Sequence, residues 1–345
     1  MALTKTLSVA LVSTLACSMV TVGASASASD IAELKKAYER PTDIPFPEEN
    51  PHSKEKEKLG KILYFDPRLS ASGTQSCATC HNPSFSWGDG MGLGTGHEHK
   101  KLGRKSPSIL NLAWDHEAEA YMWDGRKESL EDQALGPIEA GVEMNMAIDK
   151  LLASLKDIKE YEPLFKAAFP KDKDPISAQN IAKAIATYER TVVSGEAPFD
   201  QWIKGKEKAI SESAKRGFVL FNKKANCAAC HSGWRFSDAS FHDIGIPDED
   251  IGRGAHVPNV KAMQHAFKTV GLRNIDRRGP YMHNGSLKTL MDVINHYDHG
   301  FKERESLSSD IKKLELTEDE KKDLVAFLHT LTSDDEPVGL PALPM

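Results

Sequence analysis

Helical periodicity dominates the pattern of apolar and polar positions along this chain. Residues 177–193 carry apolar side chains at helical spacing behind Ser177, a suitable N-cap. Residues 149–169 show a similar pattern. Thr317-Glu318-Asp319-Glu320 forms a capping box that opens a further helix running through Leu331. These segments predict a mostly α-helical protein.

The rest of the pattern supports the same fold class. No stretch keeps the apolar–polar alternation of a half-buried strand. Glycine and proline interrupt residues 88–103 and 245–254, so we expect long loops there.

The N-terminus follows a different pattern. Lys5 precedes an apolar stretch from Leu7 to about Val22, and small residues follow up to Ala28. This is the pattern of a cleaved secretory signal peptide over residues 1–28, which predicts export to the periplasm. A membrane anchor, or a lipoprotein acylated at Cys17, are the alternatives. No other segment is apolar enough to span a membrane, so we expect no span in the mature chain.

Composition narrows the class of protein. The 345 residues are 40% hydrophobic and 27% charged, which is typical of a globular protein. Lys and Arg total 44 against 50 Asp and Glu, so the net charge is -6 and no basic excess indicates a nucleic-acid partner. Of five cysteines, Cys17 leaves with the signal peptide and four remain.

Those four cysteines form two copies of one motif. Cys77-Ala78-Thr79-Cys80-His81 and Cys227-Ala228-Ala229-Cys230-His231 both read C-x-x-C-H, the attachment signal of c-type haem. Two thiols form thioethers to the porphyrin, and the adjacent imidazole becomes the proximal iron ligand. A zinc site or two redox disulfides are alternatives, but neither explains a histidine after both pairs. We therefore predict two covalently bound haem c groups, with His81 and His231 as proximal ligands.

The segments around the two motifs repeat each other. Tyr121-Met122-Trp123-Asp124-Gly125 resembles Tyr281-Met282-His283-Asn284-Gly285, and continuing this alignment places Pro137 on Tyr297. Such a repeat suggests two copies of one haem-binding unit. Proline cannot bind iron, whereas a tyrosine phenolate can, so one haem would be open and the other closed by Tyr297. A partly buried aromatic is the alternative role for Tyr297.

Taken together, the sequence resembles the bacterial di-haem cytochrome c peroxidases and their MauG-type relatives over nearly the whole mature chain. The resemblance implies two all-α cytochrome c-like domains in tandem, which we place at residues 29–200 (peroxidatic) and 201–345 (electron-transfer). The motifs that carry it, besides both C-x-x-C-H sites, are Phe65-Asp66-Pro67-Arg68-Leu69-Ser70, Trp123-Asp124-Gly125-Arg126, Gln133-Ala134-Leu135-Gly136-Pro137, Val142-Glu143-Met144, Leu272-Arg273-Asn274 and Pro280-Tyr281-Met282-His283-Asn284-Gly285.

By position, the resemblance assigns roles to several residues. Gln133, Pro137 and Glu143 match the peroxide pocket, where a carboxylate can move a proton between the peroxide oxygens. Trp123 matches the tryptophan that lies between the haems. His97, followed by Arg104 and Pro107 at family spacing, matches a removable sixth ligand of the first haem. His99 is a nearby alternative for that ligand. The other possibility is that both histidines are exposed loop residues that bind no iron.

Two positions depart from the standard peroxidases. Those enzymes carry methionine at the position of Tyr297, whereas the MauG type carries tyrosine. An anionic oxygen ligand stabilises oxidised iron and lowers its potential. Lys105 stands where the family has an asparagine ligand to a calcium between the haems, beside backbone carbonyls expected at Arg278 and Pro280. We therefore predict weak or absent calcium.

The resemblance implies a periplasmic peroxidase that reduces hydrogen peroxide at the N-terminal haem, while the C-terminal haem relays or stores oxidising equivalents. Its electron donor would be a small cytochrome c or a cupredoxin. A MauG-like enzyme would instead oxidise a partner protein through a high-valent di-haem state. Tyr297 favours the second version and His97 the first, so the substrate stays open, as does a homodimer, which is common in the family.

An electron carrier or redox sensor with two six-coordinate haems is the remaining alternative. Retention of Gln133, Pro137 and Glu143 together argues against it, because a carrier needs no proton shuttle.

Overall fold

The computed structural model describes residues 28–118 and 120–345, so all but the last residue of the expected signal peptide lies outside it. The described chain is mostly helical, with one two-stranded antiparallel pairing of β1 (Phe241–His242) with β2 (Phe267–Lys268). The α-helices are α1 (Ala28–Lys36), α2 (Lys54–Phe65), α3 (Cys77–Cys80), α4 (Leu130–Glu139), α5 (Ile148–Asp157), α6 (Tyr161–Ala168), α7 (Ala178–Thr191), α8 (Pro198–Ile203), α9 (Glu212–Asn222), α10 (Leu290–Asn295) and α11 (Glu318–His329).

Two of the three helix predictions are confirmed, and the third is wrong in part. Ser177 caps α7 by accepting a hydrogen bond from the N–H of Asn180, and Thr317 caps α11 through the expected capping box. Residues 149–169 are not one helix but two, α5 and α6. Pro163 explains the break, because in a continuous helix its ring would clash with the carbonyl four residues earlier.

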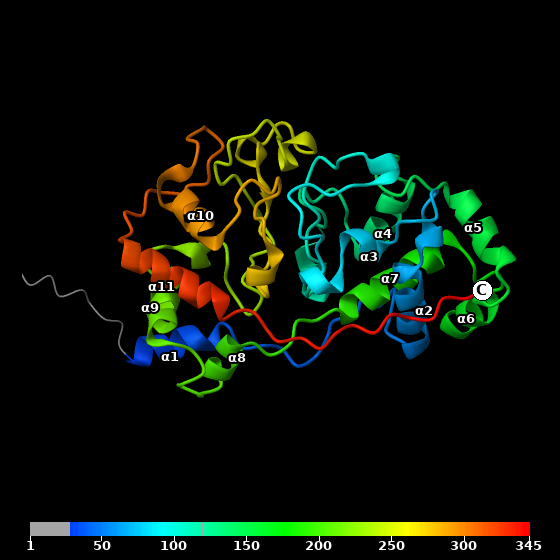
Figure 1. The fold of residues 1–345 in the computed structure, drawn as a ribbon, viewed down its shortest axis with the longest axis horizontal. Helices are drawn as coiled ribbons and strands as arrows, with labels where there is room; N and C mark the ends of the chain where they lie inside the picture. Colours follow the sequence, from blue (N-terminus) through cyan, green and yellow to red (C-terminus); the bar gives the residue numbers. More distant parts are fainter. Residues whose placement is uncertain (1–27, 119) are drawn as a thin grey trace, which may run out of the picture.

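The helices pack around two hydrophobic cores, one in each lobe of the molecule (Figure 1). The first core is built by α2, α4, α5, α6 and α7, and the second by α8, α9, α10 and α11. The predicted division at residue 200 falls inside α8, which packs in the second core through Phe199 and Trp202. The chain therefore passes from the first hydrophobic core to the second a few residues before residue 200.

Both ends of the described chain cross to the opposite lobe. Tyr38, just after α1, is buried in the second core, with its ring stacked on Phe236 at a centroid distance of 4.8 Å. The C-terminal segment runs back along the molecule, and Val338 and Leu343 pack against the first core (Figure 1). There Arg68 donates a hydrogen bond from Nη1 to the carbonyl of Pro344 at 2.8 Å.

Each core contains the same crossing of two helices, as the repeat predicts. Helix α2 crosses α7 at Gly60, and α9 crosses α11 at Gly217. A Cβ at Gly60 would lie 1.9 Å from the carbonyl oxygen of Ala184, and one at Gly217 would lie 1.9 Å from that of Asp323. Glycine is required at both positions because the facing helix backbone occupies the space of a side chain.

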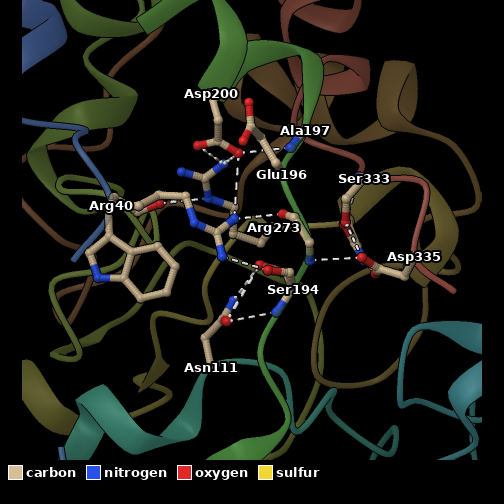
Figure 2. A network of polar contacts seen from close by, with 12 residues as sticks. Arg40, Asn111, Ser194, Glu196, Ala197, Asp200, Arg273, Ser333 and Asp335 are labelled. Atoms are coloured by element: carbon tan, nitrogen blue, oxygen red, sulfur yellow. Dashed lines mark hydrogen bonds and ion pairs between the residues drawn. The ribbon is translucent and has the colours of Figure 1, made fainter. Parts of the chain in front are cut away.

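The two domains are also joined by a polar network at the linker (Figure 2). Arg40 donates to the carbonyls of Ser194 at 2.5 Å and Gly195 at 2.6 Å, and the N–H of Gly195 donates to Asp335 at 2.7 Å. The side-chain oxygen of Asn111 accepts from the N–H of Ser194 at 3.0 Å. Segments from both termini and from the first domain thus hold one short stretch of linker.

We predict that Gly60→Ala lowers the free energy of unfolding by about 2–3 kcal/mol, because the added methyl group must displace the α7 backbone. Urea unfolding followed by far-UV circular dichroism measures this change. Gly136→Ala is the matched control. This α4 glycine has its nearest contact at 3.5 Å, so alanine should leave stability unchanged or raise it by up to about 1 kcal/mol. Equal losses in both variants would contradict the crossing argument.

Candidate functional site: two cavities with a shared wall

The first cavity has a volume of about 530 Å³ and is lined by both domains. Cys77, Cys80 and His81 of the first motif line it, as do Lys268 and Arg278 from the second domain. This size is in the range of cavities that bind small molecules and cofactors.

The second cavity is smaller, about 170 Å³, and holds the second motif. Cys227, Cys230 and His231 line it together with Tyr297. Because the two cysteine pairs line different cavities, the four thiols do not form one zinc site.

Both motif histidines are fixed by the same kind of hydrogen bond. The Nδ1–H of His81 donates to the carbonyl of Pro107 at 2.8 Å, and that of His231 donates to the carbonyl of Phe236 at 2.8 Å. A carbonyl can only accept, so Nε2 of each ring carries the free lone pair. Burial also lowers the pKa of both imidazoles. Both rings are therefore neutral and oriented, as a proximal iron ligand must be.

The three residues of the expected peroxide pocket all line the first cavity. Gln133 and Pro137 lie on α4, which begins at the N-cap Ser129, and Glu143 lies in the turn that follows. Burial raises the pKa of Glu143, and Arg126 opposes part of this rise. The structure thus brings together a carboxyl group with a high proton affinity, an amide, and a proline that offers no ligand.

His97 is not among the residues that line the first cavity, although its neighbour Gly96 is. The backbone N–H of His97 donates to the carbonyl of Glu143 at 2.8 Å, and its imidazole Nε2 lies 3.8 Å from Glu98. The neighbouring alternative, His99, is exposed. The structure thus ties the His97 loop to the peroxide-pocket turn without bringing the imidazole into the cavity, and its role as a removable ligand stays a prediction.

Tyr297 lies where α10 widens into a single π-helical turn, His296–Gly300. The carbonyl of Ile244 accepts a hydrogen bond from Nε2 of the adjacent His296 at 2.8 Å. Burial raises the pKa of the Tyr297 phenol, with the nearby thiols of Cys227 and Cys230 adding to the effect. Tyr297 therefore shares a cavity with His231, as the repeat predicts, and its ligation of iron remains a prediction.

Trp123 lines both cavities. It lies in a tight turn that the second domain repeats. Met122 and Met282 both have φ of 73°, and the indole of Trp123 and the ring of its counterpart His283 meet edge to face at 6.3 Å. The indole N–H donates to the carbonyl of Lys105 at 2.8 Å. The aromatic side chain expected between the haems therefore forms part of the wall that the two cavities share.

The region expected to hold calcium contains cations instead. The ammonium group of Lys105 is buried, donates to the carbonyl of Met91 at 3.0 Å and lies 3.6 Å from Asp89. The guanidinium of Arg278 donates to the carbonyls of Gly271 and Arg273. Calcium requires six to eight oxygen ligands, and the oxygens near Lys105 already face an ammonium group. These residues do not fit calcium.

Two sets of cavity residues are absent from the sequence predictions. Lys268 and Arg235 line the first cavity from the second domain and share one carboxylate, Asp115. With Arg126 they supply the positive charge that suits the propionate groups of a haem. Glu189 of α7 also lines this cavity. Its only signal in the sequence is its position on the apolar stripe of the helix, four residues after Ile185.

The fold and the cavities define a protein with two cytochrome c-like domains, each suited to one covalently attached haem. Each cavity offers two cysteines, one oriented neutral imidazole and several apolar side chains, which fit haem c.

Comparisons with known proteins agree with this class. The family model for di-haem cytochrome c peroxidase matches residues 54–208, and the cytochrome c model matches residues 214–332. The chain is 51% identical to the methylamine utilization protein MauG of Methylorubrum extorquens, over 94% of this chain and 91% of that protein. It is 35% identical to the cytochrome c551 peroxidase of Pseudomonas aeruginosa, over 85% of this chain and 83% of that one.

A solved structure extends the likeness to three dimensions. The crystal structure of a MauG-like protein associated with microbial copper homeostasis superimposes with a TM-score of 0.78 at 31% identity, covering 86% of this chain and 95% of that one. The chain therefore belongs to the family of di-haem cytochrome c peroxidases and MauG proteins. It is an oxidoreductase with two covalently bound haem c groups.

We predict that the purified protein contains two iron atoms per chain and less than about 0.1 calcium, because Lys105 occupies the region of the cation. Elemental analysis after exchange into calcium-free buffer measures both metals. A tightly held calcium at one per chain would contradict the prediction.

We predict that Tyr297→Met raises the reduction potential of the C-terminal haem, because a neutral thioether stabilises ferric iron less than a phenolate does. Spectroelectrochemical titration resolves the two haems, and the N-terminal haem serves as the internal control. If the C-terminal potential does not change, Tyr297 is not its ligand.

Proposed function

We propose that this protein is a peroxide-dependent di-haem oxidase of the MauG type, which reduces hydrogen peroxide at the N-terminal haem and oxidises a partner protein. The observation that carries the proposal is the difference between the two cavities. Glu143, Gln133 and Pro137 line the first, and Tyr297 lines the second. One cavity is suited to a reaction with peroxide and the other to a haem with a fixed tyrosine ligand.

Peroxide cleavage needs a proton removed from one oxygen and delivered to the other. The haem, held by Cys77, Cys80 and His81, would supply the electrons for this cleavage. Burial raises the pKa of Glu143, so this carboxyl group holds a proton more readily than an exposed glutamate and can accept and return one. Gln133 orients peroxide by donating or accepting a hydrogen bond, and Pro137 keeps the face free of competing ligands.

Trp123 is the natural path for oxidising equivalents between the haems. Its indole borders both cavities, and its N–H is held by the carbonyl of Lys105, so the ring stays in one orientation. No other aromatic side chain of the described residues lines both of these cavities.

Two observations favour a protein substrate over a small electron donor. Tyr297 lines the second cavity, and as an iron ligand it would lower the potential of that haem, which disfavours uptake of electrons from a high-potential cytochrome or cupredoxin. The sequence identity to the MauG of Methylorubrum extorquens is also higher than that to the cytochrome c551 peroxidase of Pseudomonas aeruginosa.

The second candidate function is an ordinary cytochrome c peroxidase. It is favoured by the backbone hydrogen bond from His97 to the carbonyl of Glu143, which connects the His97 loop to the expected peroxide pocket.

We place the protein in the periplasm, since residues 1–28 have the composition of an export signal and both haems are of the c type. No helix in the described part of the chain is long and apolar enough to cross a membrane. A homodimer remains a prediction.

We predict that the as-isolated protein reacts with hydrogen peroxide without prior reduction, and that Glu143→Gln slows this reaction by about 100-fold or more. Stopped-flow haem spectra at several pH values measure it. The carboxylate form must accept the proton, so the rate should fall as pH drops through the pKa of Glu143, which lies above the ordinary glutamate range. Glu143→Gln should lose this acidic limb.

Glu139→Gln, an exposed change at the end of α4 and four residues before Glu143, is the control and should react at the full rate. Reaction only after half-reduction would favour the ordinary peroxidase, and no reaction in either state would favour an electron carrier. A full-rate Glu143→Gln variant would remove Glu143 from the mechanism.

A further inference from the structure

The described chain contains a buried carboxyl group that the proposed chemistry does not use. Glu189 of α7 is 4% exposed and lines the first cavity. Its Oε2 atom is buried without a hydrogen-bond partner. Buried carboxyl groups are normally paired, because an unpaired charge in an apolar interior is strongly destabilising.

The adjacent cation does not neutralise it. Arg190 donates from both terminal nitrogens to the two carboxylate oxygens of Glu131, at 2.7 and 2.9 Å. The guanidinium is thus already engaged by another acid. Besides Arg190 and Glu131, the titratable groups that interact with Glu189 are Tyr64 of α2, Cys77 of α3 and Tyr188 of α7 itself.

Tyr64, Cys77 and Tyr188 carry no positive charge. Lys56 of α2 donates to Asn50 and to the carbonyl of Pro51, and its charge interacts with Glu131 and Arg190. Asp115, beside the first cavity, is held by Arg235 and Lys268. Tyr64 donates to the carbonyl of His81 at 3.1 Å. When haem is bound in this cavity, the charge near Glu189 that would change is that of the iron.

The second domain provides an internal comparison. Gly60 meets Ala184 and Tyr188 of α7, while Gly217 meets Asp323 and Phe327 of α11. Ala184 and Tyr188 of α7 therefore correspond to Asp323 and Phe327 of α11. By the same correspondence, Glu189 in the first domain is equivalent to Leu328 in the second. Leu328 is buried and lines the second cavity. One haem site thus has a carboxyl group where the equivalent site has an alkyl side chain.

We propose that Glu189 is a redox-linked proton site of the N-terminal haem. Its carboxylate takes up one proton from water, forming an O–H bond, when the ferric iron is reduced to ferrous by one electron from an external one-electron donor. When the electron leaves, the O–H bond breaks and the proton returns to water. The pair of events keeps the net charge of the buried cavity nearly constant.

The environment of Glu189 suits this role. Burial raises its pKa to about 8, with Glu131 adding to the rise and Arg190 opposing it. A ferric haem carries one more positive charge than a ferrous haem and so favours the carboxylate. Proton affinity therefore changes with the oxidation state of the iron within the neutral pH range. Coupling of this kind matters most in a cavity where oxidising equivalents are formed, so the inference deepens the proposed function and rests on it.

The test is a spectroelectrochemical titration of both haems between pH 6 and 9, with small-molecule mediators as the one-electron donor. The N-terminal potential should be highest at low pH, where Glu189 is protonated in both redox states, and should fall as pH rises. Glu189→Gln, a neutral side chain of the same shape, should lose this part of the pH dependence. Glu189→Leu, which copies the second domain, should behave in the same way.

The C-terminal haem is the control in both Glu189 variants, and its pH dependence should not change. Leu328→Glu should instead add a pH-dependent component to the potential of the C-terminal haem, with the N-terminal haem as the control. If Glu189→Gln folds with both haems attached and keeps the native pH dependence at the N-terminal haem, the proposal is overturned. The titration uses no peroxide, so a failure of the proposed peroxide chemistry would leave this result intact.

Discussion

Two reciprocal backbone hydrogen bonds hold the haem-side turns of this protein together. The N–H of Lys268 donates to the carbonyl of Trp123 at 2.8 Å, and the N–H of Lys105 donates to the carbonyl of His283 at 2.7 Å. Each bond joins one domain to the other at the wall that the cavities share. The position of the Trp123 indole between the two cavities, and the presence of second-domain cations in the first cavity, both depend on this contact. The crossed termini and the linker network around Arg40 hold the domains in that arrangement (Figures 1 and 2).

The molecule is built from one unit used twice, and its chemistry lies in the positions where the copies differ. Structural positions are kept. Gly60 and Gly217 serve the same helix crossing, and Met122 and Met282 adopt the same left-handed backbone. The cavity positions are changed. The differing pairs, first domain before second, are Pro137 and Tyr297, Trp123 and His283, and Glu189 and Leu328. A duplicated fold thus presents two different haem cavities without a change of its framework.

The charges around the first cavity come from both domains. Lys268, Arg235 and Asp115 form a buried group that is positive overall, and Lys105 brings a further cation close to the shared wall. Such charges are stable when they face anionic groups, and haem propionates are anionic. Lys105 in place of a neutral ligand also removes the need for a bound divalent cation there, because the ammonium group already occupies carbonyl and carboxylate oxygens. The anionic propionates of a bound haem would thus balance the positive charge of these side chains between the domains.

The sequence by itself determined the features that depend on near neighbours in the chain. Helices α7 and α11 with their caps, the two C-x-x-C-H motifs, and the repeat that pairs Pro137 with Tyr297 all follow from spacing over a few residues. Periodicity did not reveal the break between α5 and α6, which Pro163 imposes. Only the tertiary structure decided which distant segments meet. It placed Tyr38 and Leu343 in opposite domains, left the His97 ring outside the first cavity, and brought Lys268 and Glu189 into it. Local pattern cannot encode these contacts, because they arise from packing between segments whose separation along the chain carries no information about their distance in space.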